Sequence, residues 1–333
     1  MGATNVGPAR RRVAVAIAAV AVAVAACAPP PPDPATGHLA VAADFNQGLL
    51  WALHDPAGPP QGANDWQCRP STVHPDPVIL VHGTFANMAD SWQALSPMLV
   101  NEGYCVFALN YGGDGPTAFF GGLRPMEQSA IDEFGPFVDR VLAATGAAQV
   151  DVIGHSQGTV VPRYWMRFGD STRPDGTPKV HRYVGVAPAG GGTTFHGLLP
   201  MVDQLNLRAA LASGCGACVE FTPGSMIPTQ LADPNPLPGE RFTGETQPGV
   251  AYTMLATRFD NFVTPYRLGF LTDPMATNTT VQDICPIDFA DHLAMIYDPV
   301  TLRLALNALD PAHAVPPRCV WVIPVFGIDL AAS

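Results

Sequence analysis

The stretch Val150-Asp-Val-Ile-Gly-His-Ser-Gln-Gly158 decides the fold that this sequence predicts. The apolar run over 150–153 is typical of a buried strand, and residues 159–168 are able to form a helix. Between them two glycines flank Ser156, and small residues at these positions let the backbone take a sharp, strained turn. The sequence therefore predicts a strand, a tight turn with Ser156 at its tip, and a helix that begins just after the serine.

A G-x-S-x-G pattern in this setting resembles the nucleophile elbow of α/β-hydrolases. In that turn the hydroxyl of Ser156 would point into a cleft, and the backbone N–H of Gln157 would face an oxyanion formed on an attacked carbonyl. The alternative is a glycine-rich turn whose serine has no role. Because the bare pattern also arises by chance, the flanking strand and helix carry the prediction.

Composition bounds the class of protein. The chain has 333 residues, of which 47% are hydrophobic and only 14% charged, so it can bury a large core. Its formal net charge is −11. A nucleic-acid-binding surface needs clustered Lys and Arg, which the sequence lacks, so we expect no nucleic-acid partner. The length fits one large or two small domains, and we expect a single catalytic domain over 38–333.

The N-terminus has the features of an export signal. Three arginines at 10–12 precede an almost uninterrupted run of Ala and Val, which predicts a signal peptide over 1–27. Residues 24–27 also resemble a bacterial lipobox, in which Cys27 would be lipidated; an ordinary cleavage site is the alternative. Residues 28–37 would then form a proline-rich spacer. We expect a secreted or cell-envelope protein.

The cysteine count agrees with export. Apart from Cys27 there are six cysteines, an even number typical of disulfides formed in an oxidising compartment. Fifteen pairings are open, and sequence proximity favours Cys68–Cys105, Cys215–Cys218 and Cys285–Cys319. A redox or zinc role for the C-x-x-C pair is the competing interpretation. It lacks a second such pair or a nearby pair of histidines, so we expect no metal.

Strand and helix patterns alternate along the chain, which is typical of a doubly wound parallel sheet with helices on both faces. Apolar runs predict further strands at 77–84, 104–110, 180–187, 250–259 and 279–284, and periodic patterns predict helices at 90–102 and 127–144. Residues 191–249 have no strong periodicity except a partly helical stretch at 198–211. We interpret this segment as a cap or lid over the active site, with a passive surface insertion as the alternative.

An acid and a base follow the serine in the order that α/β-hydrolases use. Asp260 comes directly after the strand predicted at 250–259, and His292 enters the last helical region. Asp273 and Asp283 compete as the acid, but neither ends so strand-like a run. His313 competes as the base from a proline-rich tail.

The loop after the strand at 77–84 supplies the second oxyanion donor in α/β-hydrolases. The backbone N–H of Thr84 is our candidate, with that of Phe85 next in order. His82, at the base of this loop, is interpreted as a structural side chain rather than as the catalytic base.

Together these residues resemble a bacterial family of triacylglycerol lipases and esterases, widespread in actinobacteria, over about residues 75 to 310. The matching stretches are Pro77-Val-Ile-Leu-Val-His-Gly-Thr84, Gly154-His-Ser-Gln-Gly158, Pro162-Arg-Tyr-Trp165, Thr257-Arg-Phe-Asp-Asn261, Val263-Thr-Pro-Tyr266, Asp291-His292 and Tyr297-Asp-Pro299. The resemblance implies a secreted lipase with Ser156, Asp260 and His292 as its triad and no cofactor. Asn261 stands where the family often has an acid.

The expected partner is a lipid or ester substrate, with transient contact to a lipid interface and no implied partner protein. Several apolar residues near the cleft segments favour an acyl chain, although they could be ordinary core: Phe119, Phe120, Phe195, Leu198, Leu199, Leu205 and Met226. Short-chain esterase, polyester hydrolase and acyltransferase remain open on the same scaffold. A non-catalytic lipid-binding protein of the cell envelope is the alternative from another class.

Overall fold

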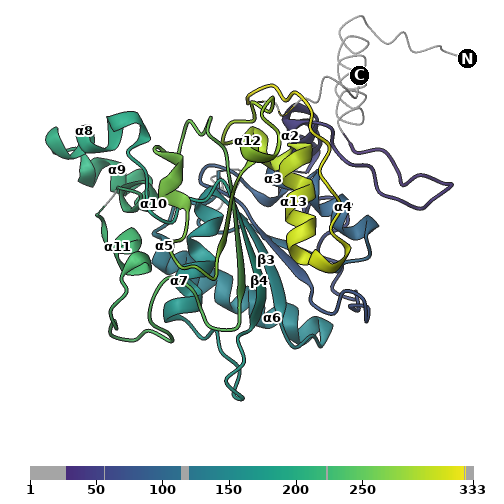
Figure 1. Ribbon diagram of the computed structural model, residues 1–333, viewed down its shortest axis with the longest axis horizontal. Helices are drawn as coiled ribbons and strands as arrows, with labels where there is room; N and C mark the ends of the chain where they lie inside the picture. Colours follow the sequence, from purple (N-terminus) through teal and green to yellow (C-terminus); the bar gives the residue numbers. More distant parts are fainter. Residues whose placement is uncertain (1–27, 56, 114–119, 223, 326, 328–333) are drawn as a thin grey trace, which may run out of the picture.

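The fold is taken from a computed structural model that describes residues 28–55, 57–113, 120–222, 224–325 and 327. The signal peptide and lipobox expected over 1–27, and Phe119, lie outside the described residues. The centre of the molecule is a six-stranded parallel sheet in the order β2-β1-β3-β4-β5-β6 (Figure 1). Its strands are β1 (Val78–Val81), β2 (Val106–Leu109), β3 (Val150–His155), β4 (Val180–Val186), β5 (Ala251–Ala256) and β6 (Thr277–Thr280).

The inner strands are mostly apolar because both faces of the sheet are covered. In β1 all four residues are buried. Val78 and Leu80 belong to one hydrophobic core, while Ile79 and Val81 belong to the other. The sheet is therefore the middle layer of three, as the alternating sequence pattern predicted.

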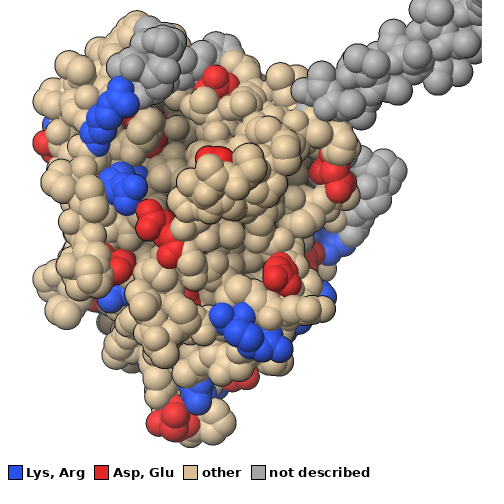
Figure 2. Space-filling view, turned by 90° about the vertical axis from the view of Figure 1, so that its right-hand side faces the viewer, with Lys and Arg blue, Asp and Glu red and all other residues tan. Residues whose placement is uncertain are grey.

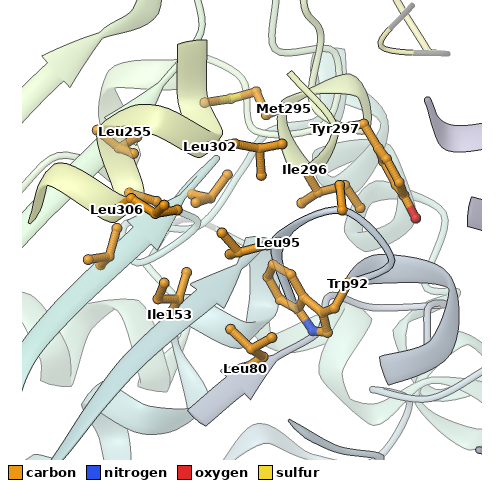
Figure 3. Packing of buried hydrophobic residues seen from close by; sticks show 14 of the residues in the cluster. Leu80, Trp92, Leu95, Ile153, Leu255, Met295, Ile296, Tyr297, Leu302 and Leu306 are labelled. Carbon is orange, nitrogen blue, oxygen red and sulfur yellow. The ribbon is translucent and has the colours of Figure 1, made fainter. Parts of the chain in front are cut away.

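Helices form the two outer layers (Figure 1). One layer packs on the core that contains Leu80 and consists of α2 (Phe45–His54), α3 (Met88–Ser91), α4 (Leu95–Asn101), α12 (Val281–Ile284) and α13 (Pro299–Leu309). Figure 3 shows Leu302 and Leu306 of α13 in this core together with Leu95 and Trp92. The opposite layer consists of α5 (Met126–Gln128), the π-helix η2 (Ser129–Phe134), α6 (Gly135–Thr145), α7 (Val161–Phe168) and α11 (Met226–Ala232).

Two expected elements differ from the prediction. The helix expected at 90–102 is split into α3 and α4, and the indole of Trp92 between them is buried. The strand expected at 279–284 is wrong beyond Thr280, because residues 281–284 form the single turn α12. That turn brings the buried side chain of Gln282 to the carboxyl end of β5, where its Oε1 accepts from Arg258 N at 2.8 Å.

Two of the predicted helices contain a proline. Pro136 lies at the start of α6, directly after the wider turns of η2, and the backbone stays helical through Phe134 and Gly135. Pro162 lies in the first turn of α7, which begins at Val161 after a 3₁₀ turn. In the first turn of a helix the N–H that proline lacks would have no helical partner, so Pro162 is tolerated there.

The described part of the segment 191–249 contains four short α-helices. Besides α11 it contains α8 (Leu198–Gln204), α9 (Arg208–Gly214) and α10 (Gly216–Glu220), so the helix expected at 198–211 is two helices. The turn between them includes Asn206 in the left-handed region at φ 56°. In Figure 1, α8 and α9 project away from the sheet.

A buried arginine holds the second half of this segment to α7. The guanidinium of Arg167 on α7 pairs with Glu240 at 2.8 Å and donates to the carbonyls of Gln230 and Asp233. Arg167 is 1% exposed. Residues 230–240 are therefore fixed to α7, whereas no comparable buried ion pair in the described residues holds α8 or α9 to it.

Three disulfides join Cys68 to Cys105, Cys215 to Cys218 and Cys285 to Cys319, the pairs expected from sequence proximity. Such cross-links are typical of proteins that fold in an oxidising, extracytoplasmic compartment. Within the described ranges no helix combines the length and apolarity that crossing a bilayer requires. On the face in Figure 2, Lys and Arg lie in small separate groups among Asp and Glu, and most of the surface is uncharged.

Candidate active site

Ser156 sits at the tip of a strained turn at the carboxyl end of β3. Its φ is +53°, in the left-handed region that a serine rarely adopts. Both glycines of the pattern are required because other backbone atoms lie too close to leave room for a side chain. A Cβ on Gly154 would lie 2.0 Å from Gly158 O, and a Cβ on Gly158 would lie 2.0 Å from Val81 O. The G-x-S-x-G sequence thus forms the sharp strand-to-helix turn that it predicted.

The predicted acid and base are brought together. His292 Nδ1 lies 3.0 Å from Asp260 Oδ1 and 2.9 Å from Asp260 Oδ2. Both side chains are almost completely buried, at 3% and 2% exposure. Because a carboxylate only accepts, Nδ1 carries the proton, and Nε2 is left with the free lone pair that a general base needs.

Asp260 is itself held in place by its own loop. Its Oδ1 accepts from the backbone N–H groups of Phe262 at 2.9 Å and Val263 at 2.7 Å. The Phe262 ring lies over the imidazole of His292, with ring centroids 5.1 Å apart. The carboxylate of Asp260 is thus oriented by two backbone N–H groups of its own loop, and the ring of Phe262 covers one face of the His292 imidazole.

The segment that carries the base meets the elbow through His155, the residue before Ser156. His155 Nε2 lies 2.9 Å from the carbonyl oxygen of His292. Among the hydrogen bonds of the described residues none joins Ser156 Oγ to His292 Nε2. Such bonds are often long without substrate and tighten in the complex with it.

Two backbone N–H groups beside the serine are available to an oxyanion. In the described part of the chain, neither Thr84 N nor Gln157 N donates to a protein acceptor, whereas Phe85 N donates to Gly121 O at 2.9 Å. Thr84 Oγ1 also donates to Gln157 Oε1 at 2.7 Å, which holds the two residues side by side. Of the two candidate donors in the loop after β1, Thr84 and Phe85, it is thus Thr84 whose backbone N–H is free to bind an oxyanion.

The strand order explains why these groups converge. The order reverses between β1 and β3, and open α/β sheets bind ligands at the carboxyl ends of strands at such a switch point. Thr84 follows β1, and Ser156 follows β3.

The competing candidates lie elsewhere. Asp283 pairs with Arg258 on the surface, Asp273 accepts from Thr246, and His313 is exposed and pairs with Asp310. His82 is fully buried, donates from Nδ1 to Gly83 O at 2.8 Å and stacks on Tyr111. Burial lowers the pKa of His82 to about 4, so it is neutral near pH 7 and makes only structural contacts.

One contact at the site was missed by sequence reasoning. Asn261 Nδ2 donates to Asp291 Oδ2 at 3.2 Å, which joins the loop of the acid to the loop of the base. An acid at 261 would instead face the carboxylate of Asp291. The sequence could have indicated this contact. Asn261 follows Asp260 and Asp291 precedes His292, so if the acid and the base are in contact, these two neighbours are also expected to be close.

The apolar residues near the cleft are mostly at the surface. Phe120, Leu198, Leu205 and Met226 are between 51% and 60% exposed. Leu199 instead packs against a core cluster, as the alternative interpretation expected of an apolar residue. Phe195 pairs with Phe262, with centroids 5.4 Å apart, and so extends the aromatic cover of the candidate base.

One group of potential metal ligands occurs in the described ranges: Asp76, Asp151 and His181 converge within 4.8 Å. They lie at the amino ends of the strands, at the opposite edge of the sheet from Ser156. His181 Nδ1 is 2.7 Å from Asp76 and 3.7 Å from Asp151, so a protonated imidazole pairs with the carboxylate of Asp76 and lies beside Asp151. Hydrogen bonding to Asp76 raises the pKa of His181, which favours this ion pair.

A parallel sheet with a strained serine turn after its third strand, and with an acid and then a base on later loops, is the arrangement of the α/β-hydrolase fold. Residues 75–218 match the model of the family described as lipase (class 2). This match covers the strands that carry Thr84 and Ser156 and ends before Asp260.

Two curated relatives are triacylglycerol lipases, from Pseudarthrobacter phenanthrenivorans and Burkholderia plantarii. Each is 38% identical over 97 residues, which cover 26% of this chain and 27% and 24% of the relatives. The chain thus matches about a quarter of their length. Among solved structures, Aspergillus fumigatus lipase B aligns over 87% of this chain and 64% of its own, with a TM-score of 0.53 and 17% identity. That likeness supports the fold alone.

Proposed function

We propose that this protein is a serine carboxylester hydrolase that cleaves acylglycerol esters through an acyl-enzyme on Ser156. The observation that carries the proposal is the buried, two-oxygen contact of Asp260 with His292, held against the strained serine turn. The class 2 lipase match and the two triacylglycerol lipases support the choice of substrate class.

In the proposed reaction His292 Nε2 takes the proton of Ser156 as Oγ attacks the ester carbonyl. The N–H groups of Thr84 and Gln157 donate to the oxyanion, and Asp260 stabilises the imidazolium. The proton then passes to the leaving alcohol, and the acyl group remains on Oγ. His292 activates water to release the carboxylic acid. This sequence of steps requires no metal or organic cofactor.

We propose that α8 and α9 form the surface that contacts lipid. Four large apolar side chains of this stretch are 49% to 60% exposed: Leu198, Met201, Leu205 and Leu207. Apolar groups that gather at the surface of a protein mark contact with another apolar phase. Phe120 and Met226, at 51% and 52% exposure, are further apolar side chains that could contact the lipid.

We further propose a single catalytic domain over 38–333, in which residues 191–249 act as a cap whose moving part is α8 and α9. Phe195, His196 and Gly197 lead into α8 with three consecutive left-handed φ values, a strained stem that a movement would relax. The second half of the cap, clamped by Arg167, would stay in place. Export through a signal peptide over 1–27, with or without lipidation of Cys27, completes the proposal.

The test is hydrolysis of p-nitrophenyl esters from acetate to palmitate by the mature chain and by Ser156→Ala. We expect activity on long chains that the substitution abolishes, with unchanged thermal unfolding as the control for folding. Activity confined to short chains would indicate an esterase. Ester products formed with an added alcohol would indicate an acyltransferase, and lack of any turnover would favour a binding protein.

A further inference from the structure

His155 occupies the position between the elbow glycine and the candidate nucleophile. It is the last residue of β3, and its ring is 2% exposed. Its Nε2 lies 2.9 Å from the backbone carbonyl oxygen of His292, a residue 137 positions later in the chain. The two imidazole rings lie with centroids 4.9 Å apart. His155 therefore connects the strand that carries the serine to the loop that carries the base.

The partner fixes the protonation state of His155. Because a carbonyl oxygen only accepts, Nε2 carries the hydrogen, and Nδ1 is the unprotonated nitrogen. Nδ1 is buried and has no hydrogen-bond partner. A Cβ on Gly83 would lie 3.1 Å from Nδ1 and 3.1 Å from Ser156 Cβ, so the backbone of the oxyanion loop covers this side of the ring.

A second proton on His155 would place an unpaired positive charge in this buried space. Burial, with the nearby His292 as a smaller cause, lowers the pKa of His155 to about 3. A neutral ring beside His292 does not oppose the positive charge that His292 gains when it takes the serine proton.

We propose that His155 is a positioning residue for the catalytic base: its neutral Nε2–H holds the backbone of His292, while Asp260 holds its side chain. Asp260 fixes the ring direction through Nδ1, but it does not fix the distance of the loop from the serine. The His155 bond supplies that second anchor from a residue directly bonded to Ser156. This inference rests on the proposed hydrolase function and adds a residue to its machinery.

The test compares His155→Gln with His155→Asn. The amide nitrogen of Gln reaches about as far as Nε2 and can keep the bond, whereas that of Asn reaches only as far as Nδ1 and cannot. Both variants are neutral and polar, so they form a matched pair. We expect Asn to lower kcat on p-nitrophenyl esters roughly 100-fold with little change in KM, because a small misplacement of a catalytic group has this effect. We expect Gln to stay within about tenfold of the wild type.

Two further measurements separate the possible failures. Thermal unfolding of both variants shows whether a loss of activity follows from a loss of folding. The rate of modification by a fluorophosphonate, which reacts with an activated serine, should fall with Asn and be largely restored with Gln. Equal effects of the two substitutions on folded protein, or no effect of either, would overturn the inference. If the wild type itself neither hydrolyses esters nor reacts with the probe, the proposed function fails instead.

Discussion

Replacing Gly158 by alanine tests the elbow directly. An added Cβ would lie 2.0 Å from Val81 O and 2.7 Å from His82 O, whereas ordinary contacts begin at 3.4 Å. The turn must therefore move by about 1.4 Å away from β1, since both obstacles are backbone atoms. We expect a loss of stability of about 3 kcal/mol, at the upper end of overpacking effects. Because the turn carries Ser156, we also expect kcat to fall roughly 100-fold.

Urea denaturation and p-nitrophenyl ester hydrolysis measure the two effects. Gly214→Ala at the end of α9 is the matched control, because its Cβ would meet no atom within 4 Å and its φ is not left-handed. The control should change stability by no more than about 1 kcal/mol. A Gly158→Ala protein with wild-type stability would refute the close approach of the turn to β1. A destabilised variant with full activity per folded molecule would refute the role of this turn in catalysis.

Three other predictions follow from single contacts. Asp260→Asn should lower kcat roughly 10⁴-fold and keep the fold, since the base loses its orienting carboxylate; equal kcat values would exclude Asp260 as the acid. Replacing Cys285 and Cys319 by serine opens a loop of 34 residues and should lower the free energy of unfolding by about 4 kcal/mol, measured in urea. Burial raises the pKa of Asp151 to about 7, so the folded protein keeps a proton that the unfolded chain releases near pH 4, and stability falls as pH rises between these values. Asp151→Asn does not titrate and should therefore gain stability relative to the wild type across this window, by up to about 4 kcal/mol; a constant difference from pH 4 to pH 8 would contradict the raised pKa.

The fold could be predicted from sequence because the strands are buried on both faces. Residues 78–81 are apolar without interruption and residues 150–153 are apolar except for Asp151, a pattern typical of strands in the middle of a covered parallel sheet. Element boundaries were less predictable. The helix expected at 90–102 breaks at Trp92, and the strand expected at 279–284 becomes a helical turn after Thr280, because in both places tertiary packing of one side chain outweighs the local pattern.

The elbow could be predicted because its requirements are local. A side chain at Gly154 would collide with the backbone of Gly158, four residues later, and a side chain at Gly158 would collide with the backbone at the end of the adjacent strand β1. Because these contacts require glycine at both positions, the turn can be recognised from the sequence pattern. Asp260 and His292 were proposed from chain order and from the strand predicted at 250–259, which ends at Ala256 in the structure. Their contact itself involves two loops 32 residues apart, and only their positions relative to the sheet indicated that they would meet.

The contacts that sequence reasoning missed depend on partners far away in the chain. Arg167 reads as one more charged residue of a helix, although it clamps a loop about 70 residues later. His155 reads as the variable position of G-x-S-x-G, yet its Nε2 meets a carbonyl 137 residues later. Neither role can be recognised from a periodic pattern or a motif, because the local backbone at these two positions would accept other residue types as well. Residues at variable positions of a catalytic motif, when buried and polar, should therefore be examined for a distant backbone partner, since burial without such a partner would be destabilising.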